Sequence, residues 1–429
     1  MVKELKHTEI GDIPVDWELQ TFDETFRVIS NNTLSRENLN NRGGAVRNIH
    51  YGDILTKFPE VLDCNEEEIP YVNELSLLSS STQLLQDGDI VVADTAEDET
   101  VGKVIEVQNL GDSKLVAGLH TIPCRVKKGD FAPGWLGYYM NSDLFHNQIL
   151  PYITGIKVSS ISKGAISETL ILVPPFDEQE KIVQSLNKIQ LLMTAETKVV
   201  NKIKLVKNGC LSKMFPQKDD TVPEMRLPGF TEAWEQRKLG DIASSFEYGL
   251  NAAAKEYDGE NKYIRITDID DNTHEFLTDS LTSPDIDLTG ADNYKLTEGD
   301  ILFARTGASV GKSYIYRNPD GLVYYAGFLI RARIKEEYDA EFVFQNTLTD
   351  RYNKYIAVTS QRSGQPGVNA QEYAEFEIKV PKKEEQTKIG TYFRNLDHLI
   401  TLHQCKCDKY SNIKKGMMND LLTGKIRLV

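Results

Sequence analysis

The sequence predicts an α+β fold in which two mixed α/β domains, related by a pseudo-twofold axis, are separated by two long antiparallel helices that form a coiled coil. Two observations carry this prediction. The chain repeats itself, because Pro174 and Lys207 recur as Pro381 and Lys414 at one offset (381 − 174 = 207). Each copy of the repeat also ends in a long apolar stripe, with the spacing of a helix that pairs with another helix.

The length predicts a chain with more than one domain, because 429 residues exceed what one core of ordinary size holds. The composition, 40% hydrophobic and 26% charged, is that of a soluble globular protein. No apolar run approaches the roughly 20 residues that cross a bilayer, and the first residues lack the apolar core of a signal peptide. The five cysteines are irregularly spaced, which argues against a disulfide framework. We therefore expect a cytoplasmic protein without a membrane segment.

The net charge of −15 limits the partners that the chain can bind alone. Binding of nucleic acid places lysine and arginine side chains against phosphates, so a strongly acidic chain is not a simple DNA binder. A local basic groove is still compatible with this sum. If the chain binds DNA, we expect weak binding by the chain alone and a contribution from partner proteins.

The repeat is gapless where the chain is most regular and drifts elsewhere. Val173–Ile182 returns as Val380–Ile389, and the offset is unchanged at Gly209 and Gly416. Upstream the match persists with small drifts: Leu85–Ile90 answers Leu296–Ile301, Val101–Lys103 answers Val310–Lys312, and Asp16–Glu18 answers Ala233–Glu235. Because insertions collect in loops, each half is a variable globular domain followed by a more constant segment.

The constant segments are predicted to be long helices with a common seam. Apolar residues recur at steps of four and three, with polar interruptions at Glu196 and Lys207 in one copy and at His403 and Lys414 in the other. This spacing is typical of a coiled coil, and each helix begins after a proline with two acidic residues that suit the helix dipole. The predicted seam comprises Ile182, Leu186, Ile189, Met193, Ile389, Phe393, Leu396 and Ile400.

We expect these helices to pair antiparallel, with Glu196 and His403 near the centre of the crossing. The alternative is two amphipathic helices that pack only on their own domains. The globular halves contain short β-like runs such as Ile90–Ala93 and Ile301–Ala304, separated by Gly, Asp, Asn and Ser. The Gly-Asp pair before each of these two runs is interpreted as a turn. A polar linker flanked by Pro216 and Pro223 separates the halves.

Motifs that imitate catalytic sites are all incomplete. Gly307–Ser313 resembles a phosphate-binding loop, but Thr306 stands where that loop needs its first glycine. Val173–Phe176 resembles an amino-methyltransferase motif, but valine cannot accept the hydrogen bond of the target amine. The His-x-Cys-x-Cys segment at 403–407 cannot close a zinc site on a helix, because residues two apart point to different faces. We therefore expect neither catalysis nor a bound metal.

The order of these features resembles the specificity subunits of type I restriction–modification enzymes over nearly the whole chain. The segments that carry the resemblance are Ile10–Glu18 and Leu227–Leu239 at the starts of the two halves, the Pro-x-x-x-Glu-Gln starts of both helices, and Leu421–Arg427. The resemblance implies a non-catalytic subunit with two target-recognition domains, each reading one half of a bipartite sequence in double-stranded DNA. It also implies that the helices set the spacer between the half-sites and dock other subunits.

The resemblance also implies partners and boundaries. Two modification (methyltransferase) subunits and the restriction (translocase and nuclease) subunits are expected to carry S-adenosylmethionine, ATP and magnesium, with no cofactor on this chain. The expected divisions are target-recognition domain 1 at 1–175, the central conserved helix at 176–215, a linker at 216–230, target-recognition domain 2 at 231–381 and the distal conserved helix at 382–424.

Candidate DNA-reading residues follow from side-chain chemistry, because arginine and lysine recognise guanine while asparagine and glutamine recognise adenine. In the second half the polar, glycine-containing loop at 360–369 is the best candidate, and the segment at 305–309 is the second. The loop at 154–163 corresponds to the former, whereas the counterpart of 305–309, at 94–98, is acidic and therefore a doubtful reader. The predicted DNA-binding residues are Lys157, Ser159, Ser160, Lys163, Arg305, Thr306, Gln361, Arg362, Ser363, Gln365 and Asn369.

Two other functions stay open at this point. A coiled-coil adaptor that does not bind DNA is favoured by the net charge of −15. A standalone methyltransferase or nuclease is the other, and the incomplete catalytic motifs weigh against it.

Overall fold

The computed structural model describes residues 4–155, 157–217 and 220–428, so Ile156 of the predicted reading loop and Lys218 and Asp219 of the predicted linker lie outside the described residues. The chain divides into two units. Unit 1 comprises Met1–Ala195 and Lys406–Val429, and unit 2 comprises Glu196–Cys405. Two long helices, α6 (Phe176–Met214) and α11 (Lys383–Leu421), each contribute one segment to unit 1 and one to unit 2.

Unit 1 is built on a five-stranded sheet. Its strands are β4 (Phe26–Val28), β13 (Thr121–Val126), β9 (Ile90–Ala93), β11 (Val104–Gln108) and β7 (Val61–Asp63), in that order, with only β11 and β7 parallel. A second sheet has the order β12 (Leu115–Ala117), β6 (Arg47–Ile49), β8 (Tyr71–Val72) and β5 (Leu39–Asn40). Strands β6 and β12 are parallel.

Unit 2 repeats this plan in a smaller form. Its four-stranded antiparallel sheet has the order β17 (Ala243–Tyr248), β24 (Leu329–Ile334), β21 (Ile301–Ala304) and β22 (Ser313–Ile315). This order matches β4, β13, β9 and β11 of unit 1. Strands β19 (Lys262–Ile264) and β23 (Val323–Tyr325) are parallel, as β6 and β12 are. The repeat in sequence is therefore also a repeat in strand order.

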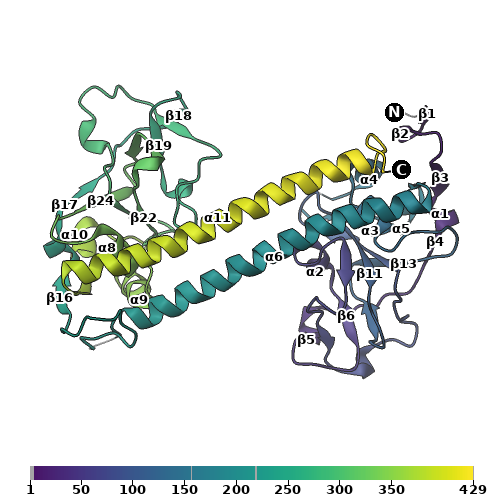
Figure 1. The fold of residues 1–429 in the computed structure, drawn as a ribbon, viewed down its shortest axis with the longest axis horizontal. Helices are drawn as coiled ribbons and strands as arrows, with labels where there is room; N and C mark the ends of the chain where they lie inside the picture. Colours follow the sequence, from purple (N-terminus) through teal and green to yellow (C-terminus); the bar gives the residue numbers. More distant parts are fainter. Residues whose placement is uncertain (1–3, 156, 218–219, 429) are drawn as a thin grey trace. The chain divides into compact units, whose positions relative to one another are not determined.

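Short elements complete both units (Figure 1). Unit 1 adds the pairs β1 (Leu5–Thr8) with β2 (Gly11–Pro14), β3 (Glu18–Thr21) with β15 (Leu170–Val173) and β10 (Thr95–Ala96) with β14 (Ser159–Ser160), and the helices α1 (Phe22–Thr25), α2 (Tyr51–Thr56), α3 (Trp135–Tyr139), α4 (Asp143–Ile149) and α5 (Lys163–Ser167). Unit 2 adds β16 (Glu235–Lys238) with β25 (Glu377–Val380), β18 (Ala254–Glu256) with β20 (Thr282–Pro284), and α7 (Leu239–Ile242), α8 (Ala340–Asn346), α9 (Asp350–Thr359) and α10 (Ala370–Ala374).

The local sequence explains where several of these elements begin. Ser142 caps α4 by accepting the amide of Phe145, and Thr349, 207 residues later, caps α9 in the same way. The predicted Gly-Asp turns also recur. Gly88 and Gly299 both have a left-handed backbone, with φ of +81° and +85°. The next residue in each turn, Asp89 or Asp300, is buried and paired with an arginine of the neighbouring strand, so these turns are structural.

The two long helices pair antiparallel within each unit, as predicted. In unit 2 Glu196 contacts His403 and Cys210 contacts Tyr392, so the partner number falls as the residue number rises. In unit 1 Glu178 contacts Arg427, just beyond the end of α11, and Gln190 contacts Lys414, which gives the same sense. The seam residues are all at least half-buried: Ile182, Leu186, Ile389, Phe393 and Ile400 are buried and Ile189, Met193 and Leu396 are half-buried. The polar interruptions of the seam have polar partners: Glu196 contacts His403, Lys207 contacts Asp397 and Lys414 contacts Gln190.

The start of each long helix is fastened by a buried carboxylate and an arginine. In unit 1 Glu178 accepts two hydrogen bonds from Arg427, both at 2.6 Å, and one from the indole of Trp17 at 3.0 Å. In unit 2 the equivalent carboxylate, Glu385, accepts two hydrogen bonds from Arg226 at 2.7 and 2.8 Å. We call these two sets of contacts the helix clamps. They orient each globular domain on its helix.

The five cysteines are free thiols. In the described part of the chain, no helix combines the length and the apolar character that a membrane-spanning segment requires.

Candidate nucleic-acid interface

In unit 2 the two predicted reading segments lie against each other. Thr306 forms an antiparallel bridge with Gly367, and the amide of Gly307 donates to the carbonyl of Pro366 at 3.0 Å. The amide of Val368 donates to the carbonyl of Arg305 at 2.9 Å. The loop after β21 and the loop between α9 and α10 therefore form one continuous edge of the domain.

Arg305 differs from the other arginines of unit 2. Its guanidinium lies over the ring of Tyr248, 4.8 Å from the centroid, a favourable cation–π geometry. Among the described residues, it has no carboxylate within ion-pair distance. Every other arginine of unit 2 has one: Arg226, Arg237, Arg265, Arg317, Arg331, Arg333, Arg351, Arg362 and Arg394. The hydrogen-bonding edge of Arg305 is therefore available to a ligand.

A cavity of about 650 Å³ lies beside Arg305. We call it the Arg305 pocket, and its walls include Tyr248, Arg265 and Phe328. Phe328 is 63% exposed, an unusual position for a phenylalanine in a soluble domain. At Gly249 a side chain would overlap the carbonyl oxygen of Ala326, so this wall of the pocket requires glycine. An aromatic surface beside an unpaired arginine suits a nucleic-acid base.

Sequence reasoning missed Tyr248 and Phe328. They lie at the end of β17 and just before β24, which are far from residue 305 in sequence but paired or adjacent in the sheet. The carbonyl of Phe328 accepts the amide of Arg305 at 3.0 Å. Tyr248 and Phe328 each stand beside a glycine in the sequence, which is only a weak signal of a functional position.

The other predicted residues of unit 2 divide into two groups. Gln361, Ser363 and Gln365 are exposed on the loop. Arg362 instead donates two hydrogen bonds to Glu372 at 2.5 and 2.7 Å, and Asn369 caps α10 by accepting the amide of Glu372 at 2.9 Å. Arg362 and Asn369 therefore hold the loop on α10, and any contact of Arg362 with a base has to compete with this carboxylate.

In unit 1 the predicted residues occupy the corresponding edge. Ser159 and Ser160 form β14, which pairs with Thr95 and Ala96 of β10. Lys157 is exposed, and so is Lys163 at the start of α5. This edge thus combines serine hydroxyl groups with two accessible lysines.

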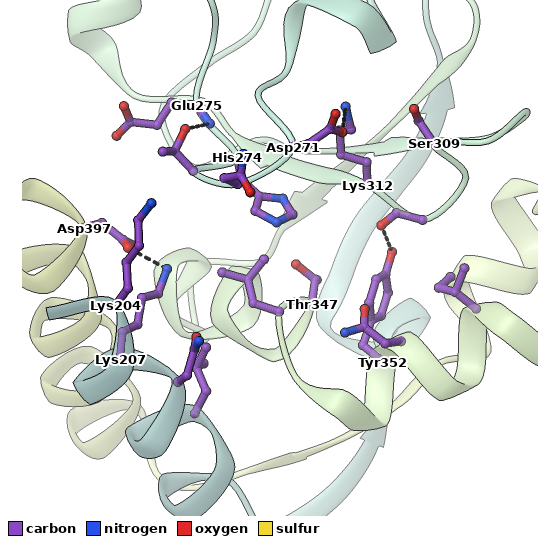
Figure 2. A pocket seen from close by; sticks show the side chains of 18 of the residues that line it. Lys204, Lys207, Asp271, His274, Glu275, Ser309, Lys312, Thr347, Tyr352 and Asp397 are labelled. Carbon is purple, nitrogen blue, oxygen red and sulfur yellow. Dashed lines mark hydrogen bonds and ion pairs between the residues drawn. The ribbon is translucent and has the colours of Figure 1, made fainter. Parts of the chain in front are cut away.

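A polar pocket of about 680 Å³ lies in unit 2 between its helix segments and its globular domain (Figure 2). Lys204 and Lys207 extend from α6, and Lys207 forms an ion pair with Asp397 of α11 at 2.5 Å. Lys312 is paired with Asp271. Two of the three lysines are thus neutralised by carboxylates, which leaves little net charge for an anionic ligand.

The titratable groups of this pocket also have structural partners. His274 is hydrogen-bonded through Nδ1 to the carbonyl of Ser313 at 2.8 Å, and burial lowers the pKa of its imidazole. Burial raises the pKa of Glu275, which accepts the hydroxyl of Thr401 at 3.1 Å. The segment that resembled a phosphate-binding loop forms part of this wall. Gly311 there lies under Ile356 with φ of +88°. The pocket is a polar contact between helix and domain.

The described residues contain no group of three or more histidine, cysteine, aspartate or glutamate side chains placed to hold a metal ion.

Comparison with known proteins matches both halves of the chain to one family. A family model described as the type I restriction modification DNA specificity domain matches residues 14–205 and 231–409. A relative named the MjaX type I restriction enzyme specificity subunit, from Methanocaldococcus jannaschii, is 24% identical over 433 residues, covering 99% of this chain and 96% of the relative. The MjaVIII specificity subunit of the same organism is 23% identical over 285 residues, 64% of this chain and 66% of the relative.

Solved structures show the same fold. The crystal structure of a type I restriction–modification S subunit from M. genitalium matches with a TM-score of 0.61 and 14% identity, covering 98% of this chain and 99% of that one. A structure from work on complex assembly and conformational transition of the type I R-M system matches with a TM-score of 0.50 and 14% identity, covering 96% and 99%. These matches bear out the α+β fold class with two long helices.

Proposed function

The chain belongs to the type I restriction modification DNA specificity family, and on that premise we propose that it reads a bipartite sequence in double-stranded DNA, with one half-site for each unit. Catalysis has no place on this chain in the proposal. Modification subunits carry S-adenosylmethionine and methylate DNA, and restriction subunits carry ATP and magnesium for translocation and cleavage. This chain recognises the DNA sequence on which those activities act.

The observation that carries the proposal is the unpaired guanidinium of Arg305 in its pocket. An arginine fork matches the O6 and N7 acceptors that guanine presents in the major groove, and a good contact of this kind discriminates by about 1–3 kcal/mol. Tyr248 orients the guanidinium from one side. The exposed amides of Gln361 and Gln365 lie on the adjoining loop and suit adenine. The alternative, a coiled-coil adaptor that does not bind DNA, does not explain this arrangement of side chains.

The test of this role uses the complex of the chain with its modification partners, because the net charge of −15 predicts weak binding by the chain alone. Arg305→Ala is expected to weaken binding to the target duplex on the order of tenfold, and to remove the preference for guanine at one position. Replacing that guanine by 7-deazaguanine should weaken the wild-type complex and leave the variant unaffected.

Arg237→Ala is the matched control, because Arg237 lies on β16 and is paired with Glu235. A contact with phosphate alone would instead lower affinity equally for all sequences and flatten the salt dependence. Sequence preference that is the same in wild type and Arg305→Ala contradicts the proposed role. Binding without any sequence preference in the wild-type complex contradicts the proposed function and favours the adaptor.

We propose that the partner subunits dock on an apolar stripe that both helices carry. Apolar, exposed residues stand at equivalent places just before seam residues or before the polar interruptions of the seam. They are Leu192 and Leu399, and Val206 and Ile413, and the members of each pair are 207 residues apart. These four residues are 39–45% exposed. Leu192 and Ile413 belong to unit 1, and Val206 and Leu399 belong to unit 2. In an antiparallel pair with one seam, these positions share a face, so each unit offers one equivalent surface.

Two equivalent surfaces suit two copies of one partner, which is why we assign them to the two modification subunits. The double variant Val206→Asp/Leu399→Asp is expected to retain one modification subunit when the complex is purified and weighed by native mass spectrometry. Ile286→Asp is the control, since Ile286 is exposed on a loop of unit 2. Retention of both subunits by the double variant contradicts this docking surface.

We also propose that the helices set the spacer between the half-sites. Each is 39 residues long, which corresponds to roughly 58 Å at 1.5 Å per residue. Inserting one heptad at equivalent positions of both helices preserves the seam and adds roughly 10 Å. The unread spacer is then expected to lengthen by about three base pairs at 3.4 Å each. A methylated sequence with an unchanged spacer contradicts the ruler.

A further inference from the structure

We propose that Asp94 in unit 1 is the counterpart of Arg305, and that it reads the exocyclic amino group of a cytosine or an adenine. The inference rests on the proposed function and names the chemistry by which the two units differ. At one equivalent position unit 2 presents a donor to the acceptor edge of guanine, whereas unit 1 presents an acceptor to an amino group. The acidic segment at 94–98, which the sequence marks as a doubtful reader, thereby acquires a reading role.

The backbone frameworks around the two residues match bond for bond. The amide of Asp94 donates to the carbonyl of His120 at 3.1 Å, and the carbonyl of Asp94 accepts the amide of Ile161 at 2.9 Å. In unit 2 Arg305 makes the same two bonds, with Phe328 at 3.0 Å and Val368 at 2.9 Å. The next residues also correspond, because Thr95 pairs with Ser160 and Thr306 with Gly367. Asp94 therefore occupies the place of Arg305.

The strand before each residue extends the match. The amide of Ala93 donates to the carbonyl of Lys103 at 2.9 Å, and the amide of Ala304 donates to that of Lys312 at 2.8 Å. The glycine before each lysine closes the turn by donating to the same alanine. Since the framework is shared, the exchange of Asp for Arg alters the chemistry of the site without altering its position.

Asp94 keeps one carboxylate oxygen for a ligand. The hydroxyl of Thr95 donates to Oδ1 at 2.8 Å, and Nδ1 of His120 lies 3.4 Å from the same oxygen. Among the described residues, Oδ2 has no hydrogen-bond partner, and the side chain is 26% exposed. An ionised carboxylate only accepts hydrogen bonds and repels phosphate. In the major groove the donors are N4 of cytosine and N6 of adenine, so an amino group is the ligand that fits.

An aromatic surface accompanies both residues. In unit 2 it consists of Tyr248 and Phe328 around Arg305. In unit 1 the rings of His120 and Tyr51 are arranged edge to face, with their centroids 5.2 Å apart. The centroids of the Tyr51 and His50 rings are 4.7 Å apart. His50 is itself fixed, because its Nδ1 accepts the amide of Gly52 at 3.1 Å. The site at Asp94 thus also has aromatic side chains beside the proposed reading residue, and it differs from its counterpart in the sign of its charge.

The test compares base analogues in synthetic duplexes bound by the complete complex. At each position of the half-site read by unit 1, adenine is replaced by purine, or cytosine by pyrimidin-2-one, so that only the amino group is lost. One such replacement is expected to weaken wild-type binding on the order of tenfold. The same replacement should have no further effect on Asp94→Ala. Whether the sensitive base is adenine or cytosine identifies which amino group is read.

Asp94→Asn is the second variant, since it keeps the size of the side chain and the bond from Thr95 but places an amide where the free oxygen stood. It should lose the sensitivity as Asp94→Ala does, while Asp112→Ala, on an exposed turn of unit 1, should retain it. If Asp94→Ala and the analogues lower binding independently at every position, the inference is wrong and the proposed function stands. If the wild-type complex prefers no sequence, both are wrong.

Discussion

The helix clamps of the two units hold equivalent carboxylates with different neighbours. Glu178 is bound by Arg427, by Trp17 and by the amide of Leu428 at 3.2 Å, and Arg427 also reaches Asp16 at 2.9 Å. Glu385 is bound through its side chain by Arg226 alone among the described residues, and the indole nitrogen of Trp234 has no partner. The same position is therefore held by a network in unit 1 and by one ion pair in unit 2.

The difference shows how a repeated fold tolerates divergence. The bidentate arginine is retained because an uncompensated buried carboxylate is costly, whereas the surrounding hydrogen bonds are free to change. Removal of the arginine should therefore affect the two units unequally.

The largest effect is expected for Arg226→Ala. It leaves Glu385 buried without a side-chain partner and should cost about 3–5 kcal/mol in the free energy of unfolding of unit 2. Arg427→Ala leaves Glu178 with its bonds from Trp17 and Leu428, so unit 1 should lose about 1 kcal/mol less. Hydrogen exchange of the amides in each unit measures both losses. A larger loss for Arg427→Ala would show that the network in unit 1 is cooperative.

The next effect concerns two equivalent glycines, Gly102 and Gly311, with φ of +89° and +88°. An alanine at either site adopts a strained left-handed backbone at about 1–2 kcal/mol. The new methyl group at residue 311 would lie 2.6 Å from Cγ2 and 3.2 Å from Cβ of Ile356, near the root of that side chain. At residue 102 it would meet only the flexible end of Ile149.

Gly311→Ala is therefore expected to cost about 1 kcal/mol more than Gly102→Ala, because Ile356 cannot move aside without shifting α9. Thermal unfolding of the two variants beside wild type gives this order. Equal losses would mean that the packing around the two turns is not different in rigidity.

A smaller effect is expected from pH. Burial alone would raise the pKa of Glu178, but the hydrogen bonds from Arg427 and Trp17 outweigh it and hold this pKa below its ordinary value of 4.5. A lowered pKa in the folded state contributes stability that is present above pH 4.5 and is lost as the pH falls through the folded-state pKa. Thermal unfolding between pH 6 and pH 3 should therefore show a shallower dependence in Arg427→Ala than in wild type. Identical slopes would remove Glu178 from the account of acid stability.

The helices could be predicted from the sequence because the repeat there is gapless and its periodicity is direct. The match of Glu196 with His403 followed from the polar interruptions of the seam, and the two residues are in contact. The loops proposed to read DNA were harder to predict, because insertions shift the offset of the repeat from 207 to 211 at Asp94 and Arg305 (305 − 94 = 211). The sequence aligned 94–98 with 305–309 but marked 94–98 as a doubtful reader, and the backbone hydrogen bonds show that Asp94 and Arg305 occupy equivalent positions.

The ion pair between Arg362 and Glu372 could not be predicted either, since it depends on how the loop folds back on α10. Composition marked residues 360–369 as the better reading loop, whereas the unpaired arginine is Arg305. A residue's free hydrogen-bonding capacity is a property of its tertiary neighbours, and local sequence does not encode it.

The most direct test of the account is a genome-wide methylation map of cells that express the complete system with wild-type chain or with Arg305→Ala. We expect one bipartite methylated sequence for the wild type. We expect the variant to relax one guanine position in one half-site and to leave the other half-site and the spacer unchanged. A contiguous target, or a variant that alters both half-sites together, would contradict the claim that each unit reads its own half of the DNA.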